Sequence, residues 1–232
     1  MFNSRRVFQG LFRNCWRHPI ETVVRLGTTA AIWIIWCVQH SLLNSEGPIR
    51  RTSILSSRIG PYYRLLYVLI SIITLSLVIW ATSHIAEHRL LEWPDWSRPV
   101  QAGIWIGAIA LFWLSFRRLD PWRLLGLRAS LKSDAPKARP DGLVTTGIYG
   151  YIRHPQFLAG LMVLWARDLT DRGLVTTIVL SSYLFIGARI EESRLLAKMG
   201  DRYRRYHSEV PGFIPRIVSR PREGNSDNKA DR

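Results

Sequence analysis

The sequence predicts an all-α fold: a polytopic membrane helical bundle of about five transmembrane helices, followed by a cytoplasmic amphipathic helix near the C-terminus. Two observations lead to this prediction. Apolar residues gather in blocks that exclude charge, although the mean hydropathy of the whole chain is only +0.02. The basic residues, which give the 232-residue chain a formal net charge of +15, fall mostly between these blocks. Little of the chain is left for a separate soluble domain.

The first three blocks predict three membrane-spanning helices. Residues 26–45 and 65–83 contain no charged side chain, and about 20 such residues cross the hydrocarbon core at a rise of about 1.5 Å per residue. Residues 99–116 form a slightly shorter block that carries Trp105 and Trp113 among aliphatic side chains. We therefore expect a three-helix membrane scaffold within residues 22–116.

Two shorter apolar blocks predict a membrane helical hairpin. Residues 156–166 and 173–188 are each short of a full span, and the polar run between them, residues 167–173, predicts a tight turn. Arginines at the ends of these blocks can extend to the interface: Arg167, Arg172 and Arg189. The alternative, two buried helices of a soluble protein, is weaker beside three clear spans.

The basic balance of the chain, with a pI near 10.8, raises the question of a nucleic-acid partner. The positions of the charges argue against one, since the arginines and lysines crowd the connections. By the positive-inside bias, the first and third connections and the C-terminal tail face the cytoplasm, and the mildly acidic loop 84–99 faces outward. Five spans then place the basic arm, residues 1–21, outside, unless that arm lies along the interface or the first span is misread.

The remaining features complete the predicted organisation. Residues 117–215 form a region that holds the hairpin and the C-terminal helix, and residues 216–232 form a polar tail that we expect to be disordered. The two cysteines, Cys15 and Cys37, imply neither a disulfide framework nor a metal cluster, because Cys37 lies inside a predicted span. The first block is expected to be a retained anchor rather than a cleaved signal peptide.

The stretch from Asp141 to Phe157 carries the most informative pattern, a polar and aromatic lead-in to a membrane helix. Its glycines allow a ligand to approach the backbone closely, and Pro155 suits the first turn of the helix that follows. Arg153 and His154 are therefore expected at a helix N-terminus near the membrane surface. A guanidinium beside free N–H groups suits a carboxylate or phosphate. The alternative is a juxtamembrane arginine that binds lipid headgroups.

A second informative stretch follows the last predicted span, where Glu191 and Glu192 are adjacent. Two carboxylates beside a low-dielectric region are costly unless cations or hydroxyl groups meet them. A ligand with an ammonium, a sulfonium or ribose hydroxyls would do so, and so would an ion pair with Arg153 or Arg189. Apolar and aromatic side chains then recur at spacings of four, four and three, which predicts one face of a surface amphipathic helix: Leu195, Met199, Tyr203 and Tyr206.

In combination, these motifs resemble those of the isoprenylcysteine carboxyl methyltransferase superfamily of integral membrane methyltransferases. The matching elements occur in order: Gly147-Ile148-Tyr149, Arg153-His154-Pro155-Gln156-Phe157, Glu191-Glu192, Leu195, Met199-Gly200, Tyr203, Tyr206, Val210-Pro211 and Pro215. The resemblance implies that the two stretches meet at the cytoplasmic face and enclose S-adenosylmethionine. It implies cofactor contacts at the following residues: Asp141, Gly142, Leu143, Val144, Tyr149, Arg153, His154, Pro155, Gln156, Phe157 and Glu191.

The chemistry of these residues agrees with that ligand, which presents a carboxylate, two cations, ribose hydroxyls and an adenine ring. Arginine and helix-end N–H groups suit the carboxylate, glutamate suits the ribose or a cation, and aromatic rings suit the adenine or the sulfonium. Methyl transfer is an in-line displacement from an activated donor, so positioning and desolvation supply much of the rate. An elaborate set of acids and bases is not required.

Departures from the family pattern bear on the acceptor. Prenylcysteine methyltransferases place a substrate arginine one helical turn before the first glutamate, where this chain has Gly187, and Arg189 is then the nearest candidate catalytic residue. Residues 39–43 and 63–67 are similar to bacterial relatives that include methanethiol S-methyltransferase and NnrU-type membrane proteins. In this half of the chain we interpret His40 as a hydrogen-bonded helix-end residue rather than a catalytic base.

The leading interpretation is a multi-pass membrane methyltransferase with its cofactor site on the cytoplasmic face. It transfers a methyl group from S-adenosylmethionine to a small thiol or a lipid-like acceptor such as a prenylcysteine carboxylate. Two alternatives stay open: an NADPH-dependent membrane reductase related to sterol reductases, and a non-enzymatic NnrU-type membrane protein. The expected partners are the acceptor and membrane lipids, with no nucleic acid and no metal.

Overall fold

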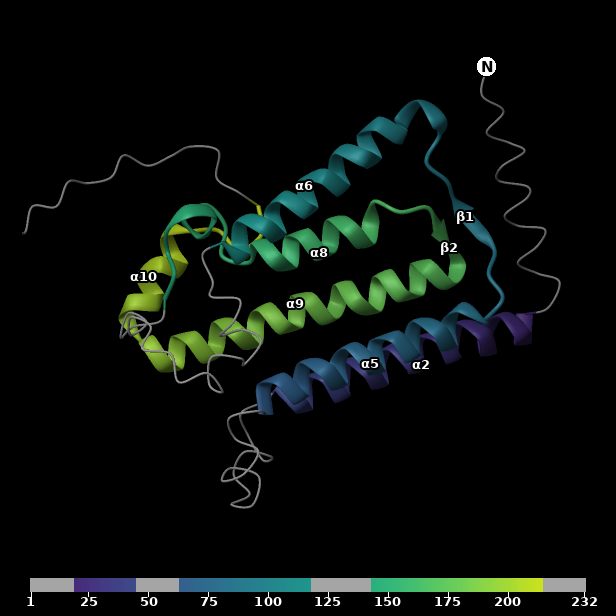
Figure 1. Ribbon diagram of the computed structural model, residues 1–232, viewed down its shortest axis with the longest axis horizontal. Helices are drawn as coiled ribbons and strands as arrows, with labels where there is room; N and C mark the ends of the chain where they lie inside the picture. The colour runs from purple at the N-terminus through teal and green to yellow at the C-terminus, as the bar shows by residue number, and fades with distance from the viewer. Residues whose placement is uncertain (1–18, 45–62, 118–142, 215–232) are drawn as a thin grey trace, which may run out of the picture.

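The computed structural model describes residues 19–44, 63–117 and 143–214. Within these ranges the chain forms a row of helices with two very short strands. The row is built from α2 (Pro19–Asn44), α5 (Tyr63–Ser83), α6 (Arg98–Phe116), α8 (Pro155–Trp165) and α9 (Asp171–Met199). Figure 1 shows α9 in the middle, with α2 and α5 along one side and α8 and α6 along the other. The predicted all-α polytopic bundle is confirmed.

Four of the described helices are long and apolar enough to cross a membrane. These are α2, α5, the stretch from Asp95 to Phe116 that contains α6, and α9. Large apolar side chains on their outward faces are exposed, among them Ile35, Ile72 and Ile106. In water such an apolar surface would be costly, whereas a bilayer accommodates it. The three scaffold spans lie within a few residues of their predicted limits at the C-terminal ends, and α2 begins earlier, at Pro19.

The predicted hairpin is present, but its two arms differ in length. Helix α8 has 11 residues, whereas α9 has 29 and runs on past the predicted limit at Ala188 to Met199. Thr170 starts α9, because its side chain accepts a hydrogen bond of 2.9 Å from the N–H of Gly173. Gly200 ends it with φ = 56°, a conformation that other residues adopt at a cost.

Gly200 also divides the predicted amphipathic helix. The stripe of Leu195, Met199, Tyr203 and Tyr206 is predicted on one surface helix, but its last two residues belong to a separate helix, α10 (Asp201–Glu209). The stripe nevertheless packs together, since Leu195 and Met199 lie against a buried cluster of Tyr203, Tyr206 and Val210. Tyr203 is only 2% exposed, so the apolar face of the predicted amphipathic helix is buried against this cluster, and the break at Gly200 is the departure from the prediction.

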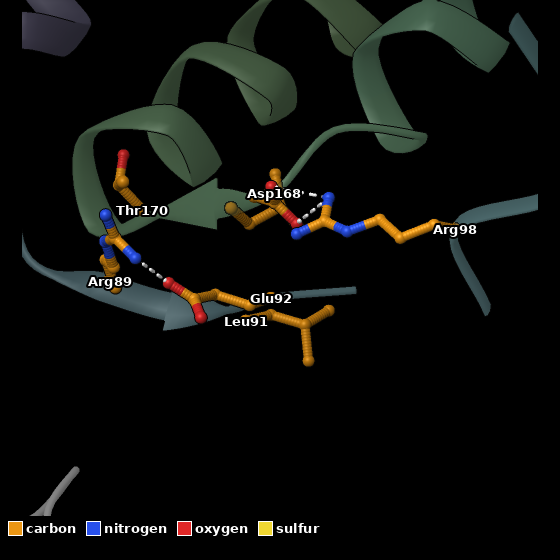
Figure 2. A pocket seen from close by; sticks show the side chains of 7 residues that line it. Arg89, Leu91, Glu92, Arg98, Asp168 and Thr170 are labelled. Carbon is orange, nitrogen blue, oxygen red and sulfur yellow. Dashed lines mark hydrogen bonds and ion pairs between the residues drawn. The ribbon is translucent and has the colours of Figure 1, made fainter. Parts of the chain in front are cut away.

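At one end of the bundle, which we call the turn end, residues 84–97 meet residues 166–172. Strand β1 (Arg89–Leu91) pairs antiparallel with β2 (Leu169–Thr170), a strand pair absent from the sequence prediction. A 3₁₀ turn, η1 (Asp95–Ser97), leads into α6. Figure 2 shows the ion pairs beside these strands, with Arg98 bound to Asp168 at 3.0 Å and Arg89 bound to Glu92.

Further contacts at the turn end join the outer helices to the hairpin. Asp171 forms a 2.5 Å ion pair with Arg25 of α2 and accepts hydrogen bonds from the N–H groups of His88 and Arg172. Arg172 binds Glu87 at 2.5 Å and the carbonyl of Thr82. The turn end is therefore a polar network that fixes α2, α5 and α9 relative to one another.

Candidate functional site

The opposite end of the bundle, which we call the motif end, brings the two informative stretches of the sequence together. The lead-in stretch contributes the 3₁₀ turn η3 (Gly147–Gly150) and the first turn of α8, which has Pro155 at its first position and His154 as N-cap. The acid pair lies on the last third of α9, and α10 returns the chain to the same place. Figure 1 shows α10 and the start of α8 at this end.

The backbone after α10 closes on the lead-in stretch. The N–H of Arg153 donates to the carbonyl of Pro211 at 2.9 Å, and the N–H of His154 donates to the carbonyl of Gly212 at 3.0 Å. A Cβ at Gly212 would lie 3.4 Å from the Arg153 guanidinium, in van der Waals contact with it. The segment that follows α10 is thus part of the site, although in the sequence Val210-Pro211 stands out only as an element of the family pattern.

Arg153 is buried in this arrangement, with only 10% of its side chain exposed. Its Nη1 donates to the carbonyls of His207 and Val210, at 2.6 and 2.9 Å, and its Nη2 lies 2.7 Å from Oε1 of Glu192. The alternative of an arginine that faces lipid headgroups does not describe this geometry. Its Nε is buried and has no hydrogen-bond partner among the described residues.

His154 connects Glu192 to an aromatic wall. Its Nε2 lies 3.0 Å from Oε1 of Glu192, and its ring stacks on Phe157 with a centroid separation of 5.4 Å and an interplanar angle of 5°. Phe213 extends this wall, with its ring 5.6 Å from that of His154 and 5.0 Å from that of Phe185. The His154 imidazole is therefore held in place by a carboxylate and by two aromatic contacts.

The two adjacent glutamates have different surroundings. Glu192 is 12% exposed and is bound by Arg153 and His154, while His207 approaches it to 3.7 Å. Glu191 is 53% exposed, and its carboxylate lies 3.7 Å from Nδ1 of His154. Since successive helical residues point about 100° apart, one carboxylate is directed into the fold and the other toward solvent. Glu191 is the one left with free acceptor capacity.

Tyrosines support the lead-in stretch. The carbonyl of Tyr149 accepts a 2.7 Å hydrogen bond from the hydroxyl of Tyr206, which joins η3 to α10. Burial raises the pKa of Tyr149 and of Tyr206, and burial followed by the charge of Glu192 raises the pKa of Tyr203 to about 12. All three phenols therefore stay neutral at physiological pH and act as hydrogen-bonding and packing groups.

The other candidate residues fall into three groups. Asp141 and Gly142 lie outside the described residues. Leu143 packs on the Tyr203 cluster, and the next residue, Val144, is partly buried. Pro155, Gln156 and Phe157 form the first turn of α8. Arg189 is exposed and lines a shallow groove with Ser193 and Ala197, on the side of α9 away from Glu191, since residues two positions apart point in nearly opposite directions. The structure does not bring Arg189 into contact with the Arg153–Glu192 cluster.

A metal is not indicated by the described part of the chain, which holds no group of three His, Cys, Asp or Glu side chains placed to bind one. The residue that sequence reasoning undervalues is Glu192. The sequence draws attention to the pair of acids, but the family resemblance implies a ligand contact for Glu191 alone. The adjacent position of the two acids is the signal, and the direction of each side chain depends on the fold.

Comparison with known proteins connects this geometry to a family. The family described as NnrU protein matches residues 28–206, a range that contains both informative stretches. The chain belongs to the NnrU family. No solved structure matches it.

Curated relatives of this NnrU-family chain carry methyltransferase names. Methanethiol S-methyltransferase 2 of Bradyrhizobium diazoefficiens is 30% identical over 173 residues, which cover 72% of this chain and 64% of the relative. Methanethiol S-methyltransferase of Mycobacterium tuberculosis is 28% identical over 192 residues, which cover 78% and 74%. Protein-S-isoprenylcysteine O-methyltransferase of Schizosaccharomyces pombe is 37% identical over 79 residues, which cover 32% and 34%.

The match to the first of these relatives spans slightly less than two thirds of that relative's length. The predicted superfamily is confirmed by the names of the relatives together with the family match. The predicted multi-pass membrane architecture is supported by the four long apolar helices and by membership of the NnrU family.

Proposed function

We propose that this protein is an S-adenosylmethionine-dependent membrane methyltransferase that acts on a small thiol. One observation carries the proposal: the fold brings the lead-in stretch and the acid pair together, with Arg153 and His154 both bound to Glu192 and with Glu191 left half exposed beside them. The methanethiol S-methyltransferase names of several relatives point to the same chemistry.

The residues present fit this cofactor. The buried Nε of Arg153, which has no partner among the described residues, and the first-turn N–H groups of α8 are donors for a carboxylate. Glu191 is an acceptor for ribose hydroxyls or for an ammonium, and the ring of Phe157 offers a flat face to an adenine or a sulfonium. We propose that these residues bind it together with Leu143, Val144, Tyr149, His154, Pro155 and Gln156, and with Asp141 and Gly142 from outside the described residues.

When bound, S-adenosylmethionine supplies a methyl group on a positively charged sulfur. Its transfer to a thiol gives a methyl thioether and S-adenosylhomocysteine, and the proton of the thiol is released to water. The chain's own contribution is positional. Glu192 fixes Arg153 and His154, the stacked His154 and Phe157 rings form a rigid wall, and the segment 210–213 excludes water from one side. Fixed donors in a site of low dielectric favour reaction without a strong base.

A small thiol is favoured over a prenylcysteine for a reason of shape and charge. Position 187 is a glycine whose Cβ would meet nothing within 4 Å among the described residues, so in this part of the structure the face of α9 before Glu191 offers space and no cation. Arg189, the nearest arginine on α9, lies on another face with Ser193. An acceptor carboxylate would find no partner among the described residues of this face, whereas a neutral thiol needs none.

We also propose that the motif end faces the cytoplasm. The end of α9 and α10 carry a dense group of basic side chains: Arg189, Arg194, Lys198, Arg202, Arg204 and Arg205. The loop at the turn end is mildly acidic by comparison, with Glu87, Glu92 and Asp95 near Arg89 and Arg98. This asymmetry follows the positive-inside bias and would give the site access to the cytoplasmic cofactor pool.

The proposal is tested by isothermal titration of the purified protein in detergent with S-adenosylhomocysteine. The wild type is expected to bind, and Glu191→Gln is expected to bind about 10- to 100-fold more weakly, since a hydrogen bond to a charged group contributes about 1.5–3 kcal/mol. The matched control is Glu92→Gln, which removes an exposed glutamate at the turn end and should leave binding unchanged.

A second measurement follows the transfer of a labelled methyl group to methanethiol. Arg189→Ala is expected to retain both cofactor binding and transfer, because its side chain points away from Glu191 on α9; a loss of transfer with normal cofactor binding would instead assign Arg189 to the acceptor. Binding of NADPH in place of S-adenosylhomocysteine would show a reductase. Binding of neither would support the non-enzymatic alternative and overturn the proposal.

A further inference from the structure

A polar cluster lies inside the bundle where three apolar helices meet. His40 of α2 contacts two side chains of α5, with Nε2 at 2.8 Å from the Tyr67 hydroxyl and Nδ1 at 3.2 Å from the Ser71 hydroxyl. Tyr183 of α9 completes the cluster, since its ring lies 6.2 Å from the His40 ring and its hydroxyl accepts from Ser41 at 3.1 Å. Polar groups within spanning helices are costly and commonly mark a functional site.

Two indole N–H groups beside this cluster have no acceptor among the described residues. Trp33 is 6% exposed, and the Nε1 atoms of Trp33 and Trp36 are both buried without a hydrogen bond. The ring of Trp36 stacks on His40 at 5.0 Å and 25°, and Trp33 meets Trp36 edge to face at 6.0 Å. An unpaired buried donor is costly, and no water in the hydrocarbon core relieves it. Two such donors in one place point to a ligand that accepts from them.

The face of α9 that carries Tyr183 leads directly to the proposed cofactor site. Tyr183, Gly187 and Glu191 are spaced four residues apart and so share one face of the helix. The absence of any atom within 4 Å of a Cβ at Gly187 leaves the middle of this face open. Tyr183 and Glu191 are about 12 Å apart along the axis at a helical rise of about 1.5 Å per residue.

We infer that the cluster formed by Trp33, Trp36, His40, Tyr67 and Tyr183 is the acceptor site, and that it binds a small neutral thiol reached from the bilayer. This inference rests on the proposed function and adds the residues that would carry the acceptor. Sulfur is a weak hydrogen-bond acceptor that also packs well on aromatic rings, and both kinds of contact are present. These five side chains include no lysine or arginine, so the cluster itself offers no charged partner to an acceptor with a carboxylate.

The test uses 2,2,2-trifluoroethanethiol as the probe and fluorine NMR of the full chain in detergent, with S-adenosylhomocysteine present. The wild type is expected to broaden and shift the probe signal in a saturable manner. Gly187→Leu fills the open face and is expected to weaken probe binding at least tenfold, while calorimetry shows unchanged binding of S-adenosylhomocysteine. Gly103→Leu is the matched control, because a Cβ at Gly103 on α6 would also meet nothing within 4 Å and this position lies outside the cluster.

A second pair of variants tests the indole donors alone. Trp33→Phe and Trp36→Phe keep an aromatic ring and remove the N–H, so each is expected to weaken probe binding several-fold. The melting temperature should not fall through loss of a hydrogen bond, because the described residues offer none to these donors. A purely structural role would produce the reverse, a lower melting temperature with normal probe binding.

The outcomes separate the two proposals. Normal binding of S-adenosylhomocysteine together with equal probe binding in the wild type, Gly187→Leu and both phenylalanine variants would show partition into detergent and overturn the acceptor site. Saturable probe binding that is lost in Gly187→Leu supports the site even if S-adenosylhomocysteine does not bind, and in that case it is the proposed function that fails.

Discussion

The turn end and the motif end both join arginines to carboxylates, but they do so with different degrees of completeness. At the turn end Asp171 is bound by Arg25 and by two backbone N–H groups, and Glu87 is bound by Arg172 and Thr170. At the motif end Glu192 has two close partners, Arg153 and His154, whereas the carboxylate of Glu191 stays 3.7 Å from the His154 ring. A complete network stabilises the fold, and an incomplete one retains the capacity to bind.

The contrast lies in the carboxylates and not in the arginines. Arg167 at the turn end has a buried Nε without a partner among the described residues, just as Arg153 does at the motif end. Both guanidiniums are otherwise well bound, Arg167 by the carbonyl of Gly173 and the hydroxyl of Thr177. What distinguishes the motif end is a free carboxylate beside a fixed imidazole.

The largest effect is expected at the turn end, where Asp171→Asn leaves Arg25 buried without a charged partner. Only 14% of the Arg25 side chain and 12% of that of Asp171 are exposed. Removal of one member of a buried pair destabilises by about 3–5 kcal/mol, which denaturant titration in mixed micelles would measure. Binding of S-adenosylhomocysteine to the folded fraction should stay within about twofold of the wild type, because the two ends share no contact that this pair supplies. Weakened binding at full stability would contradict the separation of the two ends.

Glu192→Gln is expected to affect both stability and binding. The fold loses about 2–3 kcal/mol, toward the lower end for a buried pair because Arg153 keeps two carbonyl acceptors. His154 loses its charged partner, so we expect binding of S-adenosylhomocysteine to fall about tenfold, as for a fixed polar network that is only partly satisfied. Calorimetry and unfolding of the same preparation measure both quantities. A variant as stable as the wild type would show that Glu192 is not a structural member of the network.

Glu191→Gln is expected to affect binding without affecting stability. Because this side chain is 53% exposed and weakly partnered, its replacement should change stability by less than about 0.5 kcal/mol. Binding of S-adenosylhomocysteine should nevertheless weaken. Thermal unfolding alongside calorimetry gives both values, and a marked loss of stability with retained binding would place Glu191 in the same structural role as Glu192.

The smallest effect is a pH dependence at Glu87. Partial burial raises its pKa, but hydrogen bonds from Thr170 and Arg172 and the charge of Arg172 outweigh this and bring the pKa below its ordinary value of 4.5. The stabilisation is therefore complete above pH 4.5 and is lost as the pH falls through the lowered pKa. With 41% of the side chain exposed, the contribution should stay below about 1 kcal/mol. Glu87→Gln should unfold with a shallower acid dependence than the wild type between pH 5 and 3, roughly the range that brackets these values.

Much of this arrangement was predictable because hydropathy and motif order are written in the sequence. The long spans followed from hydropathy, and the meeting of the Arg153-His154 stretch with the acid pair was what the family resemblance implied. The strand pair did not, because β1 and β2 have three and two residues, too few for a periodic signal. The full length of α9 was hidden because its last turns carry charges such as Arg194 and Lys198, which end a hydrophobic block without ending a helix.

The different surroundings of Glu191 and Glu192 could not be predicted from the sequence either. Adjacent residues on a helix face different directions, and only the position of α8 beside α9 decides which carboxylate meets Arg153. The same holds for Trp33 and Trp36, which look like ordinary aromatic residues of an apolar span. Their unpaired N–H groups become visible only once the described helices are packed around them.

The shortness of α8 has a consequence for how the protein is made. Its 11 residues extend about 16 Å, roughly half of the 30 Å or so of a hydrocarbon core. Such a segment cannot be inserted as an independent span, since its backbone needs the partners that Gln101 and β1 supply. We therefore expect α8 and α9 to enter the bilayer as one unit during biogenesis. Their two motif-bearing ends arrive on the same side together, whichever way the preceding helices are oriented.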